Sequence, residues 1–313
     1  MIEAHLLGTA SCFPTPKRGV SCTALRHDDG IWLFDCGEGS QIQLQKSDIK
    51  PGRIDKIFIT HLHGDHLFGL PGLMCTIGQN NSADKKVIDL YGPIGLKTFV
   101  RTSLGLSKSN LGYEYCVHEI VEENYDQEDN GNNKLHPNEI PGELITCNAN
   151  KYWEVCKSKH FSVTAHQLEH TIFCVGFVIQ EDDLPGKLDV NLLKAKGIKP
   201  GPLYGKIKSG ENVVLDSGEE IKAESVMGPS RKGRTMVVLG DTSNSDSVIG
   251  YATGADLLLH EATYGDDMEE LAVDRGHSTA GIVCISVDVL HVEIKLSQEK
   301  TGNHFDHGCN HRK

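Results

Sequence analysis

Short apolar runs rich in β-branched residues recur along the chain and alternate with segments typical of helices. The runs at 56–59 and 235–241 are bounded by turn-forming or polar residues, a pattern that predicts buried strands. Residues 1–60 hold several such runs separated by Gly and Pro, whereas helices are expected after residue 66 and over 94–103. Because strands alternate with helices, the pattern predicts an α/β sandwich.

Polar side chains stand at the ends of several of these runs. The run 235–241 ends in Asp241, and the run 255–261 ends in Glu261. His170 lies between two further apolar runs. Because polar residues at the C-terminal ends of strands gather at one edge of a sheet, we expect the functional site at that edge.

Residues 60–66 read Thr-His-Leu-His-Gly-Asp-His, directly after a predicted strand and before a turn into a helix. Imidazole nitrogens and carboxylate oxygens are the ligands that zinc and similar metals prefer. His61 and His63 alternate along an extended backbone and can reach one ion, while Asp65 and His66 follow the turn and can reach a second. The motif therefore predicts a metal site rather than a polar loop that happens to be rich in histidine.

Composition limits the class of protein. The chain has 313 residues, a length that fits one large α/β domain or two small ones. Its content of 38% hydrophobic and 24% charged residues is typical of a soluble globular protein. No apolar run approaches the length of a membrane span, and the N-terminus lacks the pattern of an export signal. The ten cysteines form no CxxC pair. We therefore expect reduced thiols in a cytoplasmic protein, or in one shared between cytoplasm and nucleus, without a membrane partner.

Charge is unevenly distributed along a chain whose net charge is −12. Residues 119–143 hold eight acidic residues and one lysine, which predicts a solvated loop. Residues 185–208 hold six lysines and one acidic residue. A local basic segment matters more than net charge for binding phosphates, so a nucleic-acid partner is not excluded.

Several short elements together resemble the metallo-β-lactamase superfamily, and within it the short-form tRNase Z family. The narrower resemblance rests on a His-Glu-Ala-Thr element, a His-Ser-Thr element and a Phe-Asp-Cys-Gly-Glu-Gly turn. It extends over residues 1 to about 281. The elements lie at 32–39, 60–66, 168–170, 239–242, 260–263 and 276–279.

The resemblance implies a four-layer αββα sandwich and two Zn²⁺ ions per chain. It assigns a ligand role to six residues. The first zinc would be held by His61, His63 and His170, the second by Asp65 and His66, and both by a bridging Asp241.

The resemblance also implies hydrolysis of a phosphodiester in precursor tRNA, which removes the 3′ trailer. Asp65 would accept a hydrogen bond or a proton from the nucleophile, and His277, oriented by Glu261, would protonate the leaving 3′-oxygen. The alternative is structural: His277 would be a polar residue at a helix start, and Glu261 a buried carboxylate paired with a nearby base.

Residues 185–208 resemble a protruding arm that grips the tRNA, and the alternative is an ordinary exposed loop. The resemblance further implies a homodimer. Residues 14–18 are candidates for RNA contact close to the cut, whereas 231–234 is expected to be a solvated turn. The arm residues expected to bind RNA are Lys187, Lys199 and Lys206.

After about residue 281 the chain departs from the family pattern. The family continues with a helix, a strand and a histidine that completes the second zinc site, whereas residues 282–294 are rich in β-branched residues and favour a strand. His304 is the nearest match to the missing histidine, and the alternative, which we favour, is a tail that binds nothing specific. We therefore divide the chain into a domain at 1–281, whose sandwich would be incomplete at its C-terminus, and a divergent tail at 282–313. Two alternatives follow: an impaired form acting as an RNA-binding or dimer partner, and a small-molecule metallo-hydrolase of the same fold.

Overall fold

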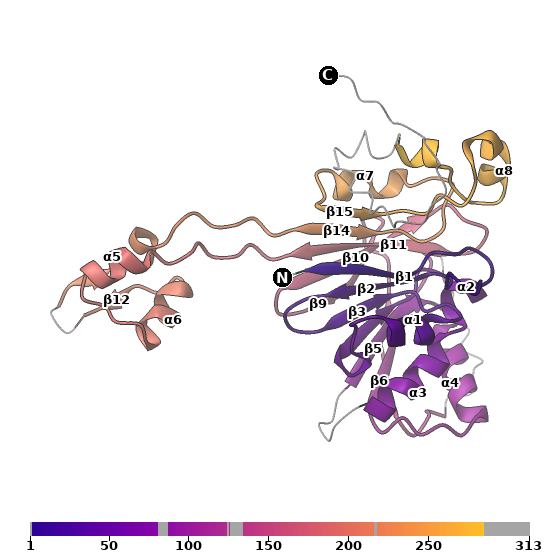
Figure 1. The fold of residues 1–313 in the computed structure, drawn as a ribbon, viewed down its shortest axis with the longest axis horizontal. Helices are drawn as coiled ribbons and strands as arrows, with labels where there is room; N and C mark the ends of the chain where they lie inside the picture. Colours follow the sequence, from indigo (N-terminus) through magenta and orange to yellow (C-terminus); the bar gives the residue numbers. More distant parts are fainter. Residues whose placement is uncertain (1, 81–86, 124, 126–133, 216–217, 285–313) are drawn as a thin grey trace.

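The computed structural model describes residues 2–80, 87–123, 125, 134–215 and 218–284. Within these residues two β-sheets pack face to face, and helices cover their outer faces (Figure 1). This is the predicted αββα sandwich, so the predicted fold class is confirmed.

The first sheet has eight strands, and its pairs are parallel from β3 onward. The C-terminal ends of its central strands therefore meet at one edge, as the sequence predicted. The strands are β1 (Glu3–Gly8), β2 (Cys22–Arg26), β3 (Ile31–Phe34), β4 (Ile54–Phe58), β5 (Val87–Pro93), β6 (Glu114–Ile120), β7 (Glu139–Ile140) and β8 (Leu144–Ile145).

The second sheet has five strands in the order β15-β14-β11-β10-β9. Its strands are β9 (Trp153–Lys157), β10 (Phe161–Leu168), β11 (Cys174–Glu181), β14 (Thr235–Val238) and β15 (Leu257–Leu259). The helical segments of the body are α1 (Ser40–Lys46), η1 (Pro51–Arg53), α2 (Gly64–Leu67), α3 (Leu70–Asn80), α4 (Leu96–Leu106), α7 (Asp246–Ala252), η3 (Asp266–Met268) and α8 (Glu269–Asp274).

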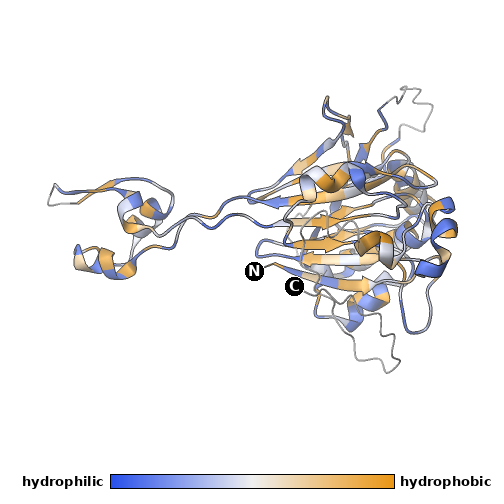
Figure 2. Ribbon diagram, turned by 90° about the horizontal axis from the view of Figure 1, so that it is seen from above, coloured by the Kyte–Doolittle hydropathy of each residue, from blue (hydrophilic) through white to orange (hydrophobic). Residues whose placement is uncertain are grey.

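Strand β3 shows how the layers form, because all four of its residues are buried. Ile31 and Leu33 pack into the core under the helices of the first sheet. Trp32 and Phe34 point the other way, into the core between the sheets. A strand buried on both faces reads as a continuous apolar run, and Figure 2 shows such apolar strands inside the body.

A long arm, residues 184–231, projects from the end of the second sheet (Figure 1). Isolated bridges Leu184↔Arg231 and Leu188↔Met227 pair its two stalk segments. Its head has a small apolar core of its own. The head contains α5 (Val190–Ala195), α6 (Pro202–Lys208), β12 (Val213–Val214), β13 (Glu220–Ile221) and η2 (Ala223–Val226). The arm is therefore about twice as long as the predicted segment 185–208, because its return half lacks the lysine enrichment that marked the outgoing half.

The expectation of a solvated turn at 231–234 is wrong. Arg234 donates two hydrogen bonds to Glu181, at 2.8 and 2.9 Å, and Arg231 donates a third at 3.3 Å. The hydrogen bonds from Arg234 lower the pKa of the Glu181 carboxyl to about 2. The two arginines thus tie the returning stalk to the end of β11, a pairing that no local pattern reveals.

The expectation of a solvated loop at 119–143 is wrong at both ends. Glu119 is buried in β6 and accepts hydrogen bonds from the backbone N–H groups of Gly95 and Lys97. Glu139 is also buried and forms a bidentate pair with Arg101 of α4. Their partners lie 22 to 38 residues away in the chain, so a count of local charge could not identify them. The central residues 126–133 lie outside the described part of the chain.

The strand expected at 282–294 is wrong where the structure describes it. Residues 280–284 are helical, and the backbone N–H of Val283 donates to the carbonyl of Thr279. Val283 packs against the core under the second sheet, so burial outweighs its β propensity. The rest of the tail, His304 included, lies outside the described residues.

Candidate metal centre

The histidine-rich motif lies on the loop from β4 to α2, at the predicted edge of the first sheet. The turn at 35–39 packs directly against this loop. A Cβ on Gly37 would lie 1.9 Å from the carbonyl oxygen of Asp65, and a Cβ on Gly69 would lie 2.1 Å from the carbonyl oxygen of Gly37. Glycine at these two positions therefore permits the close backbone packing that fixes the loop.

The ring of His61 is oriented by a chain of hydrogen bonds. Thr60 donates its hydroxyl proton to Asp35, at 3.0 Å, so the Thr60 oxygen can accept from Nδ1 of His61, also at 3.0 Å. In a neutral ring Nε2 then carries a lone pair. This nitrogen is buried and has no hydrogen-bond partner among the described residues.

The ring of His170 is oriented in the same way. Its Nδ1 donates to the carbonyl of Gly276 at 2.7 Å, which leaves Nε2 as the inward-facing nitrogen, 3.1 Å from Nδ1 of His63. Gly276 has a φ of 71°, and a Cβ there would lie 2.8 Å from Nδ1 of His170. The glycine before His277 thus brings its carbonyl against His170, across 106 residues of sequence.

His66 lies between two carboxylates. Its Nδ1 donates to Asp35 at 2.6 Å, and its Nε2 lies 3.3 Å from Asp241. Burial disfavours a charged ring, but the two carboxylates outweigh burial and raise the pKa of His66. The same contact with His66 lowers the pKa of Asp241 in spite of burial. The carboxylates of Asp35 and Asp241 therefore favour a positively charged group on this side of the site.

Sequence reasoning did not assign a role to Asp35. It is buried, has a φ of 58°, and accepts hydrogen bonds from Thr60, His66 and Ser21. It orients His66 directly and His61 through Thr60, the work expected of a carboxylate just behind the ligands of a metal. The available signal was its position: Asp35 directly follows the buried strand β3, just as Asp241 ends a buried apolar run.

The candidate ligands form two groups that share one residue. Within each group the ligand atoms lie within 4.8 Å of one another. The first group consists of the three histidines predicted to hold the first zinc. The second group consists of His61 together with two residues predicted to hold the second zinc. The groups are His61, His63 and His170, and His61, His66 and Asp241.

Asp65 belongs to neither group. Its carboxylate accepts a hydrogen bond from the Cys12 N–H at 2.7 Å and lies 3.9 Å from Nε2 of His66. The structure therefore places Asp65 beside the second group, at the wall of the site.

The donors fit metal ions of the zinc type. Burial lowers the pKa of His61 to about 2 and also lowers the pKa of His63, which keeps both rings in the neutral form that binds metals. In each neutral ring the proton lies on Nδ1, where it makes the hydrogen bond to Thr60 or to Gly276. Nε2 of His61 and of His170 therefore cannot donate a hydrogen bond. Convergent lone pairs beside a carboxylate need a cation to offset their repulsion, and nitrogen with oxygen donors suits zinc.

His277 and Glu261 form a pair next to Asp241. Nδ1 of His277 donates to Oε1 of Glu261 at 3.1 Å and lies 3.8 Å from Asp241. Glu261 is fixed by the backbone N–H groups of Thr242 and Ser278. The hydrogen bond to Glu261 raises the pKa of His277. A histidine with a raised pKa beside an open pocket can serve as a general acid near neutral pH.

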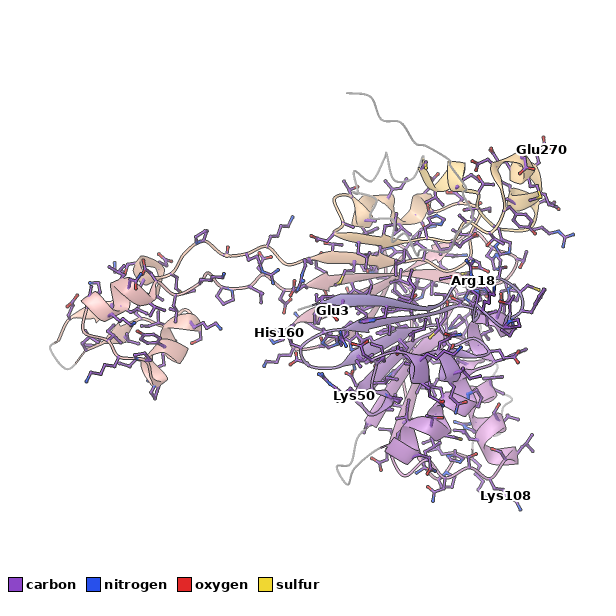
Figure 3. The ribbon with its side chains drawn as sticks, in the orientation of Figure 1. Glu3, Arg18, Lys50, Lys108, His160 and Glu270 are labelled. Carbon is purple, nitrogen blue, oxygen red and sulfur yellow. The ribbon has the colours of Figure 1, made fainter. Side chains whose placement is uncertain are left out.

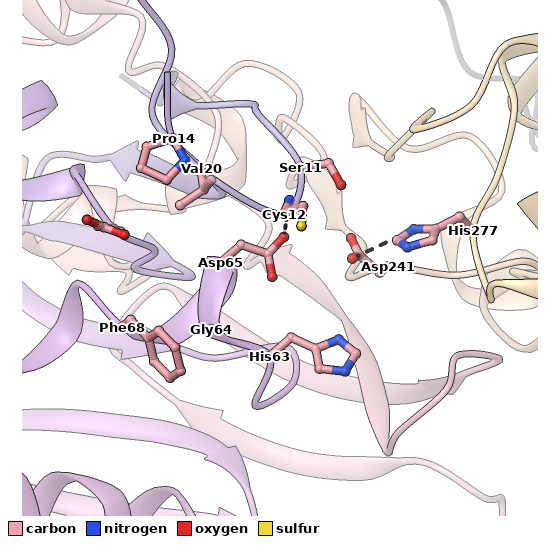
Figure 4. A pocket seen from close by; sticks show the side chains of 11 residues that line it. Ser11, Cys12, Pro14, Val20, His63, Gly64, Asp65, Phe68, Asp241 and His277 are labelled. Carbon is pink, nitrogen blue, oxygen red and sulfur yellow. Dashed lines mark hydrogen bonds and ion pairs between the residues drawn. The ribbon is translucent and has the colours of Figure 1, made fainter. Parts of the chain in front are cut away.

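These side chains open into a pocket of about 420 Å³ (Figure 4). In Figure 4, Asp65 and Asp241 occupy the middle, with His277 on one side and Phe68 on the other. The residues that line the pocket are Ser11, Cys12, Pro14, Val20, Glu38, His63, Gly64, Asp65, Phe68, Asp241 and His277.

The three lysines proposed to bind RNA are exposed on the arm, away from this pocket. Figure 3 gives the orientation: His160 lies at the end of the body from which the arm projects, and Arg18 lies at the opposite end, with α2. The 14–18 segment, in contrast, reaches the pocket through Pro14. The structure thus separates the two groups of residues proposed to contact RNA. The lysines are Lys187, Lys199 and Lys206.

A further group of metal-capable side chains lies elsewhere on the first sheet: Asp89, Cys116 and His118. Nζ of Lys56 contacts Asp89 at 2.7 Å, and burial raises the pKa of the Cys116 thiol to about 11. The lysine already supplies the positive charge, so we assign no metal there.

Comparisons with known proteins agree with this geometry. Residues 15–142 match the metallo-β-lactamase superfamily. Ribonuclease Z of Streptococcus agalactiae is 40% identical over 281 residues, which cover 89% of this chain and 82% of that protein. Ribonuclease Z of Streptococcus pneumoniae is 41% identical with the same coverage.

Among solved structures, human tRNase Z, short form, matches with a TM-score of 0.68 and 34% identity, covering 93% of this chain and 90% of that one. A long-form RNase Z from yeast, at 16% identity and a TM-score of 0.58, shares the fold over 93% of this chain and 36% of its own length. Sequence identity of this level over nearly the whole domain, together with the converging ligand groups, places the chain in the ribonuclease Z family.

Proposed function

We propose that this chain is a hydrolytic endoribonuclease that removes the 3′ trailer from tRNA precursors and leaves a tRNA 3′-hydroxyl. One observation carries the proposal: two groups of candidate ligands share His61, and the His277–Glu261 pair stands beside the Asp241 of the second group. The names of its relatives, ribonuclease Z and tRNase Z, support this activity.

We assign the metal ions as zinc, one held by His61, His63 and His170. The second would be held by His66 and Asp241, with Asp65 closing the site from the pocket wall. Two such ions, when bound, would lower the pKa of a water nucleophile and offset negative charge on the phosphate.

The chain's own residues position the reacting groups. Asp65 can accept a hydrogen bond from the attacking water, because its carboxylate faces the pocket and is anchored by the Cys12 N–H. His277 can deliver a proton to the leaving 3′-oxygen, and Glu261 orients its ring and stabilises its charged form.

The arm supports an RNA substrate. Strand β11 runs from Cys174, next to the metal centre, to Glu181 at the base of the arm. Its eight residues span roughly 25 Å, at about 3.3 Å per residue. A substrate that touches both the pocket and the arm must therefore be long and bear phosphates at both ends. A hydrolase that acts on small molecules does not need a basic arm at such a distance from its pocket.

We extend the proposal to a homodimer in the cytoplasm, or in both cytoplasm and nucleus. None of the described helices is long and apolar enough to cross a membrane. Light scattering of the purified full chain would test the dimer, since a single monomeric mass would contradict it.

The central experiment measures metal content and cleavage on the same purified chain. We expect two zinc ions per chain and cleavage of a 3′-extended tRNA at one site, with a 3′-hydroxyl on the tRNA product. Tight binding of the precursor without cleavage would instead support an impaired, RNA-binding form. Hydrolysis of small phosphodiesters with no activity on precursor tRNA would support a small-molecule hydrolase.

A further inference from the structure

Phe68 is an exposed aromatic side chain at the wall of the candidate active site. It directly follows α2, keeps 64% of its surface exposed, and lines the pocket with Asp65 and His63. A single exposed apolar side chain is common on protein surfaces, so the position of this ring in the pocket, and not its exposure alone, is what matters. A ring so close to the candidate ligands is therefore a candidate for substrate contact.

The ring is held in a defined place. The Phe68 N–H donates to the carbonyl of Gly64 at 2.9 Å, and a Cβ on Gly64 would lie 2.3 Å from the Phe68 ring. The ring thus lies over Gly64 of the histidine motif, where any side chain would displace it. The ring of Phe99 on α4 is nearly parallel to it, with centroids 6.3 Å apart and an angle of 18° between the planes. This packing fixes an aromatic face relative to Asp65 before substrate arrives.

The described residues that line the pocket provide no basic contact at this wall. Three of the residues that line it are acidic, namely Glu38, Asp65 and Asp241. Among the described residues no lysine or arginine lines it. The described pocket lining itself therefore offers no basic side chain of this kind to hold the nucleotide at the cut. Stacking on a nucleobase can hold it, because every base presents an aromatic face and the contact adds no charge.

The position of His277 decides which nucleotide reaches Phe68. His277 is the proposed acid for the 3′-oxygen of the tRNA, so the last tRNA nucleotide lies on its side of the pocket. Phe68 lies on the opposite side, together with Pro14 (Figure 4). The chain that continues beyond the scissile phosphate away from His277 is the trailer.

We propose that Phe68 stacks on the base of the first trailer nucleotide and so positions the scissile phosphate at the candidate metal centre, beside Asp65 and Asp241. This inference rests on the proposed function. It makes Phe68 a positioning residue that tolerates any trailer base, since stacking does not depend on base identity.

The test combines a protein change with a substrate change. Phe68→Leu keeps an apolar side chain over Gly64 but removes the aromatic face, and an abasic first trailer nucleotide removes the base. Phe13→Leu is the matched control, because Phe13 is 67% exposed in a neighbouring loop but does not line the pocket. Single-turnover kcat/KM is measured for each protein on the intact and the abasic precursor.

We expect Phe68→Leu to lower kcat/KM on the intact precursor by about 5- to 150-fold, the range of aromatic–base stacking. The abasic precursor should be cleaved more slowly by the unaltered chain and no more slowly again by Phe68→Leu. Phe68→Tyr should keep near-normal cleavage of the intact precursor, and Phe13→Leu should change it less than about twofold.

Equal losses by Phe68→Leu on intact and abasic precursors would overturn the inference, because they would show a role in packing only. In that case the unaltered chain still cleaves precursor tRNA, so the proposed function stands. Failure of the unaltered chain to cleave any precursor would overturn both.

Discussion

The metal centre and the arm differ in how their functional side chains are held: those of the centre are buried or half-buried and hydrogen-bonded, whereas those of the arm are exposed. In the centre, buried side chains satisfy each other in chains of hydrogen bonds, such as His61 to Thr60 to Asp35. In the arm, a small apolar core supports a head in which lysines such as Lys194, Lys199 and Lys206 are exposed. The centre has little freedom to move a ligand, whereas the arm leaves its charged groups free to follow a substrate.

The difference follows from what each region is proposed to do. Holding metal ions and a phosphate demands placement that only dense packing and second partners for each ligand provide. Capturing a phosphate backbone demands charge and reach, which depend on exposure and are sensitive to salt. Changes in the centre should therefore act on the chemistry, and changes in the arm on binding alone.

The largest effect is expected for Asp241→Ala, because Asp241 lies in contact with His61, His66 and His277. Loss of a direct ligand should exceed the roughly 10- to 100-fold effect typical of residues behind the ligands, and metal content per chain should fall. Elemental analysis and cleavage of a 3′-extended tRNA measure both. Asp246→Ala, an exposed carboxylate at the start of α7, is the control. Unchanged metal content in Asp241→Ala would refute the ligand assignment.

Asp35→Asn should give the next largest effect. It removes the charge that orients His66 and, through Thr60, His61, and should lower zinc affinity by about 10- to 100-fold. Competition with a chelator measures the affinity without reference to activity. The matched control is Asp29→Asn, an exposed carboxylate on the turn between β2 and β3. Equal affinity in the two variants would mean that Asp35 serves only the fold.

Replacing Lys187, Lys199 and Lys206 with Ala should weaken binding of precursor tRNA by roughly tenfold at moderate salt. The slope of log affinity against log salt should become shallower by about one for each lost phosphate contact. Binding is measured across a salt series. Hydrolysis of a small phosphodiester should be unchanged, because the arm does not reach the pocket.

A matched triple change of Lys46, Lys50 and Lys157, exposed lysines of the body, should leave tRNA binding within about twofold of the unaltered chain. If the arm variant lost activity on the tRNA and on the small phosphodiester equally, the division of labour between arm and centre would be wrong.

The smallest effect is expected at the base of the arm. Arg234→Gln should lower the free energy of unfolding by about 1–3 kcal/mol at pH 7, because the buried Glu181 loses the two hydrogen bonds from Arg234 and keeps only the longer one from Arg231. The folded-state pKa of Glu181 lies at about 2, below its ordinary value of 4.5. The stabilisation is therefore complete above pH 4.5 and is lost as the pH falls through about 2.

Urea unfolding between pH 7 and pH 3 checks this, since the difference between the variant and the unaltered chain should shrink below pH 4.5. Lys151→Gln breaks an exposed pair with Glu123 and should cost less than about 1 kcal/mol. If the difference in free energy of unfolding between Arg234→Gln and the unaltered chain did not change with pH, the ion pair with Glu181 would not be its cause.

The sequence by itself determined the parts that depend on local spacing. The alternation of residues 60–66 brought His61 and His63 to one side of a loop, and the carboxylate at the end of the 235–241 run marked Asp241. Buried apolar runs gave the strands of both sheets, because a strand covered on both faces must be apolar throughout.

Only the tertiary structure decided which distant groups satisfy one another. Asp35 meets His66 across 31 residues, Gly276 meets His170 across 106, and Glu181 meets Arg234 across 53. Such pairs leave no periodic trace, because a buried charge requires a partner but does not specify where in the chain that partner stands. For the same reason a local excess of acid predicted a solvated loop where Glu119 and Glu139 are buried and paired.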